Sequence, residues 1–210
     1  LLLLAAFSWV VMLSKSFFLW TTARGNKKFN ETYVQAKDPI SIENGTGQFN
    51  GSGLYRIYET GLSALDIESL NVCEDPELET RTTRFSPKVI ENLKATLEKG
   101  LMDESKRLNS WLVILTMSIS GGPFLGLLGT VWGVMNTFAA MAEAGEANIM
   151  AIAPGVASAL STTVFGLIVA IPALFGYSYL VGRIRDLTAD NTIFVDQFAL
   201  KVDAAYGDES

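Results

Sequence analysis

The sequence LNSWLVILTMSISGGPFLGLLGTVWGVMNTFAAMA, residues 108–142, contains no Asp, Glu, Lys or Arg, and neither does ANIMAIAPGVASALSTTVFGLIVAIPALFGYSYLVG, residues 147–182. Uncharged runs of this length are typical of membrane-spanning helices, because a helix satisfies its own backbone hydrogen bonds in lipid. At about 1.5 Å per residue, about 35 helical residues reach about 50 Å, whereas the hydrocarbon core of a bilayer is about 30 Å thick. Each run therefore predicts a long transmembrane helix that tilts or extends beyond the membrane.

A third apolar segment, residues 1–20, precedes these two. No basic segment stands before it, and Arg24, Lys27 and Lys28 follow it, which is the pattern of a stop-transfer helix and not of a signal peptide. The chain starts inside this run and without Met, which predicts that an N-terminal extension precedes it. We therefore expect three transmembrane helices.

Basic residues mark one side of the membrane. Residues 143–146, between the two long runs, carry two acids and no base. The opposite ends of the three spans are flanked by Arg24, Lys27, Lys28, Lys106, Arg107, Arg183 and Arg185. Because cytosolic flanks are enriched in Lys and Arg, the N-terminus is expected outside and the C-terminus in the cytosol. Residues 143–146 then form a short periplasmic turn.

Residues 21–107 and 183–210 are accordingly expected in the cytosol. Residues 38–53 are rich in Gly, Asn and Ser, which predicts a flexible loop. Apolar residues recur at helical spacing through residues 86–107, which predicts an amphipathic helix leading into the second span, and a similar stripe predicts a helical extension over residues 183–210. The expected fold class is all-α: a polytopic membrane protein with three transmembrane helices, two of them very long and extending into a helical cytosolic region.

The composition excludes several classes of function. The chain has no histidine, which removes the usual zinc ligand and the usual general base at neutral pH, and its single cysteine, Cys73, cannot form an internal disulfide. The net charge is −6 and the sixteen Lys and Arg residues are scattered, so no basic stripe for nucleic acid is present. We expect no enzyme, no metal, no cofactor and no nucleic-acid partner.

Each long run carries a face of small and hydroxylated residues at three- and four-residue steps. They are Gly122, Gly126, Gly129, Thr130, Gly133 and Thr137 in the second span, and Ser158, Ala159, Ser161, Thr162, Thr163, Gly166 and Ala170 in the third. Such faces are typical of close helix packing, which the residues alone favour, and they also suit a polar ion pathway. A hydroxyl does not bind an additional proton stably at physiological pH, so a proton pathway here would need a carboxylate from another chain.

Three prolines lie within the long runs. Pro123, Pro154 and Pro172 each remove a backbone donor, which kinks a helix and frees carbonyl groups that can line a pore. Pro123 and Pro154 equally suit positions near helix ends or bends. Both interpretations stay open.

Two motifs within the runs resemble a known family. GGPFLGLLGTVWGVMNTF, residues 121–138, and APGVASALSTTVFGLIVAIPA, residues 153–173, are similar to the proton-channel family that includes ExbB, TolQ and, more distantly, MotA. The resemblance covers residues 1–205 and is weak across residues 37–83. It implies a homo-oligomeric ring, a pentamer, in the bacterial inner membrane. The second and third helices would line its lumen, which would enclose single helices of an ExbD- or TolR-like partner with a titrating aspartate.

The resemblance also implies site residues. The pore threonine of the GTVWG segment falls on Thr130 and the second pore threonine on Thr163, and Thr162 belongs to the same expected proton pathway. ExbB and TolQ usually have a glutamate where this chain has Ser158, which we interpret as a polar pore-lining residue, with the partner's carboxylate sufficient for transfer. The residues expected to pack or kink the helices are Gly126, Gly129, Gly133, Pro154 and Pro172.

The implied function is that of a channel-forming stator subunit of an inner-membrane motor driven by the proton-motive force. Rotation of the lipid-embedded ring against its partner would exert force through a TonB-like protein and energise TonB-dependent outer-membrane transport. One alternative is a TolQ-type subunit that acts through a TolA-like protein in envelope integrity. Another is a non-conducting membrane scaffold, in which Gly and Thr only pack helices. A permease is disfavoured, because the sequence shows no internal repeat and no cluster of substrate ligands.

Overall fold

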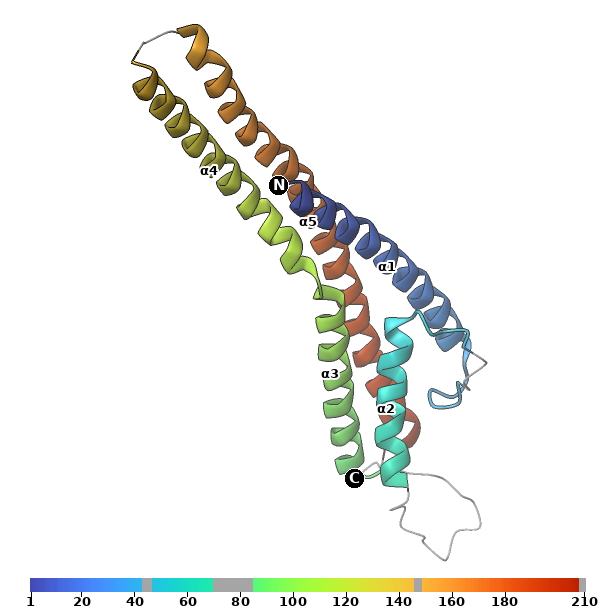
Figure 1. Cartoon of the computed structure of the whole chain (residues 1–210). Coiled ribbons are helices and arrows are strands. Elements are labelled where there is room, and N and C mark those ends of the chain that lie inside the picture. The colour runs from blue at the N-terminus through green and yellow to red at the C-terminus, as the bar shows by residue number, and fades with distance from the viewer. Residues whose placement is uncertain (43–46, 70–84, 146–148, 208–210) are drawn as a thin grey trace, which may run out of the picture. The chain divides into compact units, whose positions relative to one another are not determined.

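The computed structural model describes residues 1–42, 47–69, 85–145 and 149–207. They form the helices α1 (Leu2–Gln35), α2 (Gly53–Ser69), α3 (Pro87–Asn109), α4 (Leu112–Ala144) and α5 (Ile149–Tyr206), shown in Figure 1. Within these residues there is no strand, and the chain has three helical stretches long and apolar enough to cross a membrane. The expected all-α fold with three such helices is confirmed. Cys73, residues 43–46 of the predicted loop and Glu146 of the predicted outer turn lie outside the described residues.

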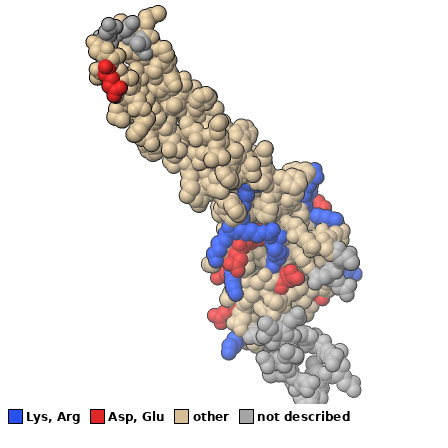
Figure 2. Space-filling view, viewed as in Figure 1, with Lys and Arg blue, Asp and Glu red and all other residues tan. Residues whose placement is uncertain are grey.

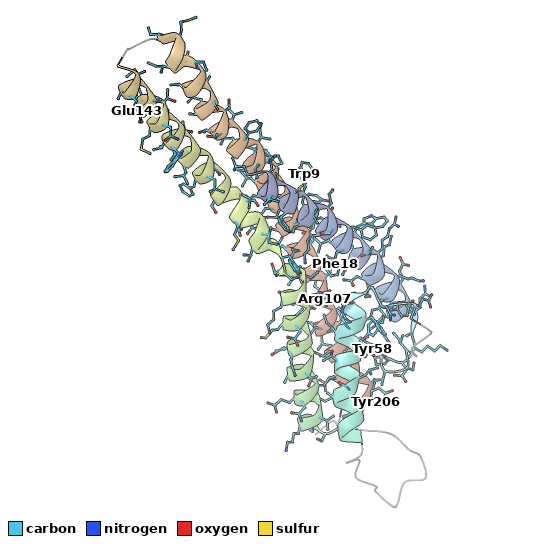
Figure 3. All side chains as sticks on the ribbon, viewed as in Figure 1. Trp9, Phe18, Tyr58, Arg107, Glu143 and Tyr206 are labelled. Atoms are coloured by element: carbon cyan, nitrogen blue, oxygen red, sulfur yellow. The ribbon has the colours of Figure 1, made fainter. Side chains whose placement is uncertain are left out.

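The chain divides into two compact units. The first unit comprises residues 1–17 and 110–182, and the second comprises residues 18–109 and 183–210. On the face drawn in Figure 2, charged side chains gather on the second unit, while the first unit is almost entirely uncharged. Glu143, near the end of α4, is one exception and is labelled in Figure 3. The two units are therefore built for different surroundings.

The surface of the first unit is apolar. Its large exposed side chains include Phe124, Leu128, Trp132, Phe165 and Phe175, each at least half exposed. A soluble protein rarely exposes contiguous apolar surface of this extent, because water disfavours it. Lipid or neighbouring protein must cover these side chains.

A change of backbone conformation at Trp111 separates α3 from α4. Trp111 has φ 69° and ψ −6°, in the left-handed region that non-glycine residues rarely adopt, and it precedes the first residue of α4. The residue is 68% exposed. At its other end α4 stops at Gly145, also left-handed with φ 68°, where the absence of a Cβ removes the steric cost.

In the second unit, Asn26 of α1 organises the start of α2. Its side-chain oxygen accepts hydrogen bonds from the Ser52 hydroxyl at 2.9 Å and from the backbone N–H groups of Gly53 and Leu54 at 2.7 and 3.2 Å. Its amide nitrogen donates to Asn191 Oδ1 of α5 at 3.2 Å. The first N–H groups of a helix lack partners within the helix, so Asn26 satisfies two of them while linking α1, α2 and α5.

Aromatic rings fill the core of the second unit. Phe29 of α1 is fully buried, and its ring lies 5.4–5.7 Å, between centroids, from the rings of Phe49, Tyr55, Tyr58 and Phe194. These are the distances at which edge-to-face and tilted ring pairs are favourable. The aromatic core therefore packs α1, α2 and α5 together around one ring.

An ion pair joins α2 to α3 in the same unit. Arg56 donates to both carboxylate oxygens of Glu104, from Nε at 3.0 Å and from Nη2 at 2.7 Å. The Glu104 side chain is 3% exposed and that of Arg56 is 27% exposed. A buried carboxylate is stable only when it is paired, and this bidentate arrangement gives both oxygens a donor.

We expect Asn26→Ala to destabilise the second unit by about 2–4 kcal/mol, because it leaves several buried donors without acceptors. Asn30→Ala is the matched control, since Asn30 is exposed and lies about one turn further along α1. Thermal unfolding of the detergent-solubilised protein, followed by circular dichroism, measures both. Equal unfolding temperatures for the two variants would contradict the capping role of Asn26.

Alkaline pH should destabilise the second unit. Burial raises the pKa of Tyr58 to about 12, and burial followed by the neighbouring Tyr58 raises the pKa of Tyr33 above its ordinary value of 10.0. A phenol whose pKa is higher in the folded state contributes stability that is fully present below the unfolded value and lost as the pH rises through the folded value. Unfolding temperatures should therefore fall from about pH 10 upward.

The Tyr33→Phe variant separates this effect from general alkaline damage. The Tyr33 hydroxyl is buried and finds no hydrogen-bond partner among the described residues, so its removal should cost no stability at pH 8. The variant should also lose less stability than the wild type between pH 9 and 11. If the unfolding temperatures of the variant and the wild type fall by the same amount between pH 9 and 11, the role assigned to Tyr33 is contradicted.

Candidate functional site

The first unit is held together by direct backbone contact between α4 and α5. A Cβ atom built on Gly126 would lie 3.0 Å from the Thr163 Cα, and one built on Gly122 would lie 2.9 Å from the Gly166 carbonyl oxygen. Gly129 faces the side chain of Thr162, whose Oγ1 would lie 2.6 Å from an added Cβ. Since real Cβ atoms do not approach backbone atoms this closely, only glycine allows the two helices to lie at this separation. We call this line of contact the glycine seam.

The glycine seam contains three of the predicted packing residues. Gly126 and Gly129 lie opposite Thr163 and Thr162, and a Cβ on Gly133 would lie 2.7 Å from the Ala159 Cβ. The structure thus places the predicted glycines and part of the predicted proton pathway on the same two facing helix surfaces.

Threonine hydroxyls converge on one carbonyl group of this seam. The Gly126 carbonyl oxygen accepts hydrogen bonds from the hydroxyls of Thr130 at 3.0 Å, Thr162 at 3.1 Å and Thr163 at 3.2 Å. The Ala159 carbonyl of its own helix, at 2.7 Å, is an alternative acceptor for the single proton of Thr162. The predicted residues Thr130, Thr162 and Thr163 are therefore neighbours around a single backbone acceptor.

Thr130 and Thr163 are also hydrogen-bonded to each other through their Oγ1 atoms, and either hydroxyl can be the donor. Each hydroxyl has one proton and two acceptor lone pairs. If Thr130 donates to Gly126, Thr163 can donate to Thr130; if Thr163 donates to Gly126, Thr130 can donate to Thr163. These two arrangements use the same heavy-atom positions, so the direction of the hydrogen-bond chain can reverse without movement of either helix.

Ser158 does not join this group. It precedes Thr163 by five residues on α5, which places the two side chains about 140° apart around the helix. Its side chain is exposed in the single chain, whereas those of Thr130 and Thr163 are half-buried. The predicted pathway residues thus divide into three threonines at the glycine seam and a serine, Ser158, on another face of α5.

The prolines lie inside the helices. Pro123 falls within α4, and Pro154 and Pro172 fall within α5, which continues through both positions. Gly155, beside Pro154, contacts the side chain of Thr137 on α4, so the glycine seam extends to this level. None of the three prolines ends a helix.

The structure also reveals a polar residue that the sequence analysis missed. Lys15 lies on α1 within the predicted first span, is 6% exposed, and donates from Nζ to the Ser110 hydroxyl at 3.2 Å. A lysine inside an otherwise uncharged run was the available signal, because ionisable side chains in a span are rare and costly.

Among the described residues no cluster of His, Cys, Asp or Glu could hold a metal ion.

The fold and the site define a class: helical membrane proteins in which two long, consecutive apolar helices meet along a surface that carries hydroxyl groups. Comparison with known proteins gives the family. The family model described as the MotA/TolQ/ExbB proton channel family matches residues 70–192, more than half of the chain. The chain therefore belongs to the MotA/TolQ/ExbB proton channel family.

Individual relatives fall into two groups. The Tol-Pal system protein TolQ of Pseudomonas aeruginosa is 26% identical over 193 residues, which cover 91% of this chain and 79% of that protein. The biopolymer transport protein ExbB of Aquifex aeolicus is 43% identical over 103 residues, covering 48% of this chain and 65% of that protein. ExbB of Pseudomonas putida is 38% identical over 96 residues, covering 46% of this chain and 29% of that protein.

We expect Gly126→Ala to separate α4 from α5 and to lower stability by about 1–3 kcal/mol, because its Cβ would meet backbone atoms that no rotamer change can move. Gly121→Ala is the matched control. Apart from the nearby backbone of α4 itself, no described atom lies within 4 Å of a Cβ added at Gly121. Thermal unfolding in detergent measures both variants. If Gly126→Ala unfolds no earlier than Gly121→Ala, the glycine seam does not control stability.

Proposed function

We propose that this chain is a channel-forming stator subunit that conducts protons together with a partner protein, and that the Thr130–Thr163 hydroxyl pair is its contact with the transferred proton. The observation that carries the proposal is this reversible hydroxyl pair, located between two helices that are long and apolar enough to span a membrane. Membership of a proton channel family supports the same proposal.

The chemistry requires a carboxylate from outside the chain. Residues 108–142 and 147–182 contain no Asp or Glu, and hydroxyls do not release a proton at physiological pH. A carboxylate on a partner helix can take up a proton from one side and release it on the other. Its charged form is costly in an apolar environment unless donors face it.

The hydroxyl pair suits both states of such a carboxylate. When the carboxylate is charged, Thr130 or Thr163 can donate a hydrogen bond to it; when it is protonated, the same hydroxyl can accept one. When Thr162 donates to the Gly126 carbonyl, Thr163 can donate to Thr130 and Thr130 to the carboxylate, or the order of the two hydroxyls can be reversed. The pair thus stabilises the charged state at one position and leaves the neutral partner free to move on.

In the proposed assembly, copies of the chain form a ring, a pentamer, in the bacterial inner membrane, with α4 and α5 around an ExbD- or TolR-like helix that supplies an aspartate. The N-terminus lies outside and the C-terminus in the cytosol, in accord with the positive-inside rule. Lipid covers the outer apolar surface of the first unit. Proton transfer turns the ring against the partner, and the partner passes force to a TonB-like protein for outer-membrane transport.

Ser158 is proposed as a polar lumen residue and not as a proton carrier. Its side chain is exposed in the single chain and lies on a different face of α5 from Thr163, so a ring in which both faces meet the lumen or the next copy gives it polar surroundings. A serine hydroxyl does not titrate at physiological pH. The partner's carboxylate is therefore the sole carrier in this proposal.

A TolQ-type role in envelope integrity, through a TolA-like protein, is the second candidate. The TolQ relatives match along 91% of this chain, whereas the ExbB relatives share higher identity over about half of it. Co-purification with tagged ExbD-like and TolR-like proteins of the same cell separates the two roles. Both roles share the proposed proton chemistry.

Thr163→Val should reduce partner-dependent proton flux into liposomes by about tenfold or more, because the loss of one hydrogen bond to a charged group is worth about 1.5–3 kcal/mol. The complex should still assemble, since valine nearly matches threonine in shape. Thr116→Val is the control: Thr116 is exposed on α4, and among the described residues its hydroxyl donates to the Val113 carbonyl of its own helix. A Thr163→Val complex that conducts like the control would favour the non-conducting scaffold.

A further inference from the structure

Lys15 is the one Lys or Arg in the first unit, which comprises residues 1–17 and 110–182. Its side chain is almost completely buried and donates a hydrogen bond to the Ser110 hydroxyl, 95 residues further along the chain. A buried ammonium group is costly unless fixed polar groups surround it, so its position is tightly constrained by its partners. Lys15 therefore ties α1 to a defined point of the chain.

That point is the start of α4. Ser110 is followed by Trp111, whose backbone is left-handed, and α4 begins at Leu112. No side chain caps this helix start. The hydrogen bond from Lys15 thus acts where the backbone direction of α4 is set.

The glycine seam requires one rotation of α4. On the α4 side it consists largely of Gly122, Gly126, Gly129 and Gly133, and an added Cβ on any of them would come within 3.0 Å of an atom of α5. Residues on a helix are about 100° apart, so a rotation of α4 by one position would carry Thr130 away from Thr163 and bring larger side chains against α5. The backbone direction set at the start of α4 must therefore match the rotation that the seam requires.

We propose that Lys15 is a positioning residue that sets the rotation of α4 through Ser110, and thereby holds Thr130 against Thr163. The inference deepens the proposed function, since it explains how the hydroxyl pair is kept aligned. It also stands as a statement about helix register alone, which a measurement without any proton flux can test.

The test is disulfide trapping. Thr130→Cys and Thr163→Cys are introduced together in a Cys73→Ser background, in full-length protein in liposomes. The native hydroxyls of these residues are hydrogen-bonded to each other, so the two sulfur atoms should lie within reach. The rate of disulfide formation with a mild oxidant then reports the register of α4 against α5.

Lys15→Met in this background removes the ammonium and keeps the length of the side chain, and we expect it to slow disulfide formation at least fivefold. Lys15→Arg should restore most of the rate, because it retains the charge and the donors. Ser110→Ala should slow the reaction in the same direction, and the Lys15→Met/Ser110→Ala double variant should be no slower than Lys15→Met. Lys28→Met, an exposed lysine on the same helix, is the control and should leave the rate unchanged.

An unchanged rate in Lys15→Met or in Ser110→Ala overturns the inference, as does an equal loss in Lys15→Arg and Lys15→Met. If Lys15→Met fails to fold, the Ser110→Ala and Lys15→Arg rates decide the question. If all rates follow expectation while Thr163→Val conducts protons normally, the proposed function fails and the positioning role of Lys15 stands.

Discussion

The contact of the α4 and α5 backbones at Gly126 is the constraint on which the rest of the first unit depends. Because no side chain separates the helices there, the Gly126 carbonyl comes within hydrogen-bonding distance of Thr162 and Thr163 across the seam. The same approach brings the hydroxyls of Thr130 and Thr163 together. Close packing of the small-residue faces and the hydroxyl pair therefore have one origin, because the packing brings the two hydroxyls together.

The two units rely on different physical interactions. Apolar burial cannot hold α4 and α5 together in lipid, which is itself apolar, so close van der Waals contact and hydroxyl–carbonyl hydrogen bonds hold them. The second unit is organised as a soluble protein is, with an aromatic core around Phe29, a buried amide network at Asn26 and the Arg56–Glu104 ion pair. α1 and α5 contribute residues to both units, so each is apolar in one part of its length and amphipathic in the other.

Local sequence patterns predicted the three long apolar helices, but they did not predict α2 or the long-range pairs. The uncharged runs predicted the long helices because lipid imposes length and composition on each helix separately. Thr130 and Thr163 were chosen as site residues from the resemblance, but their hydrogen bond depends on the register between two helices, which neither helix encodes alone. Lys15 and Asn26 were missed as anchors for the same reason: their partners, Ser110 and Asn191, lie 95 and 165 residues away.

The most direct test of the account is proton flux into liposomes that contain this chain with and without its co-expressed single-helix partner. Because the membrane helices supply hydroxyls and no carboxylate, flux should appear only with the partner and should disappear when the partner's membrane aspartate is replaced by asparagine. Equal flux from the chain alone would contradict the claim that the transferred proton is carried by a carboxylate from outside the chain.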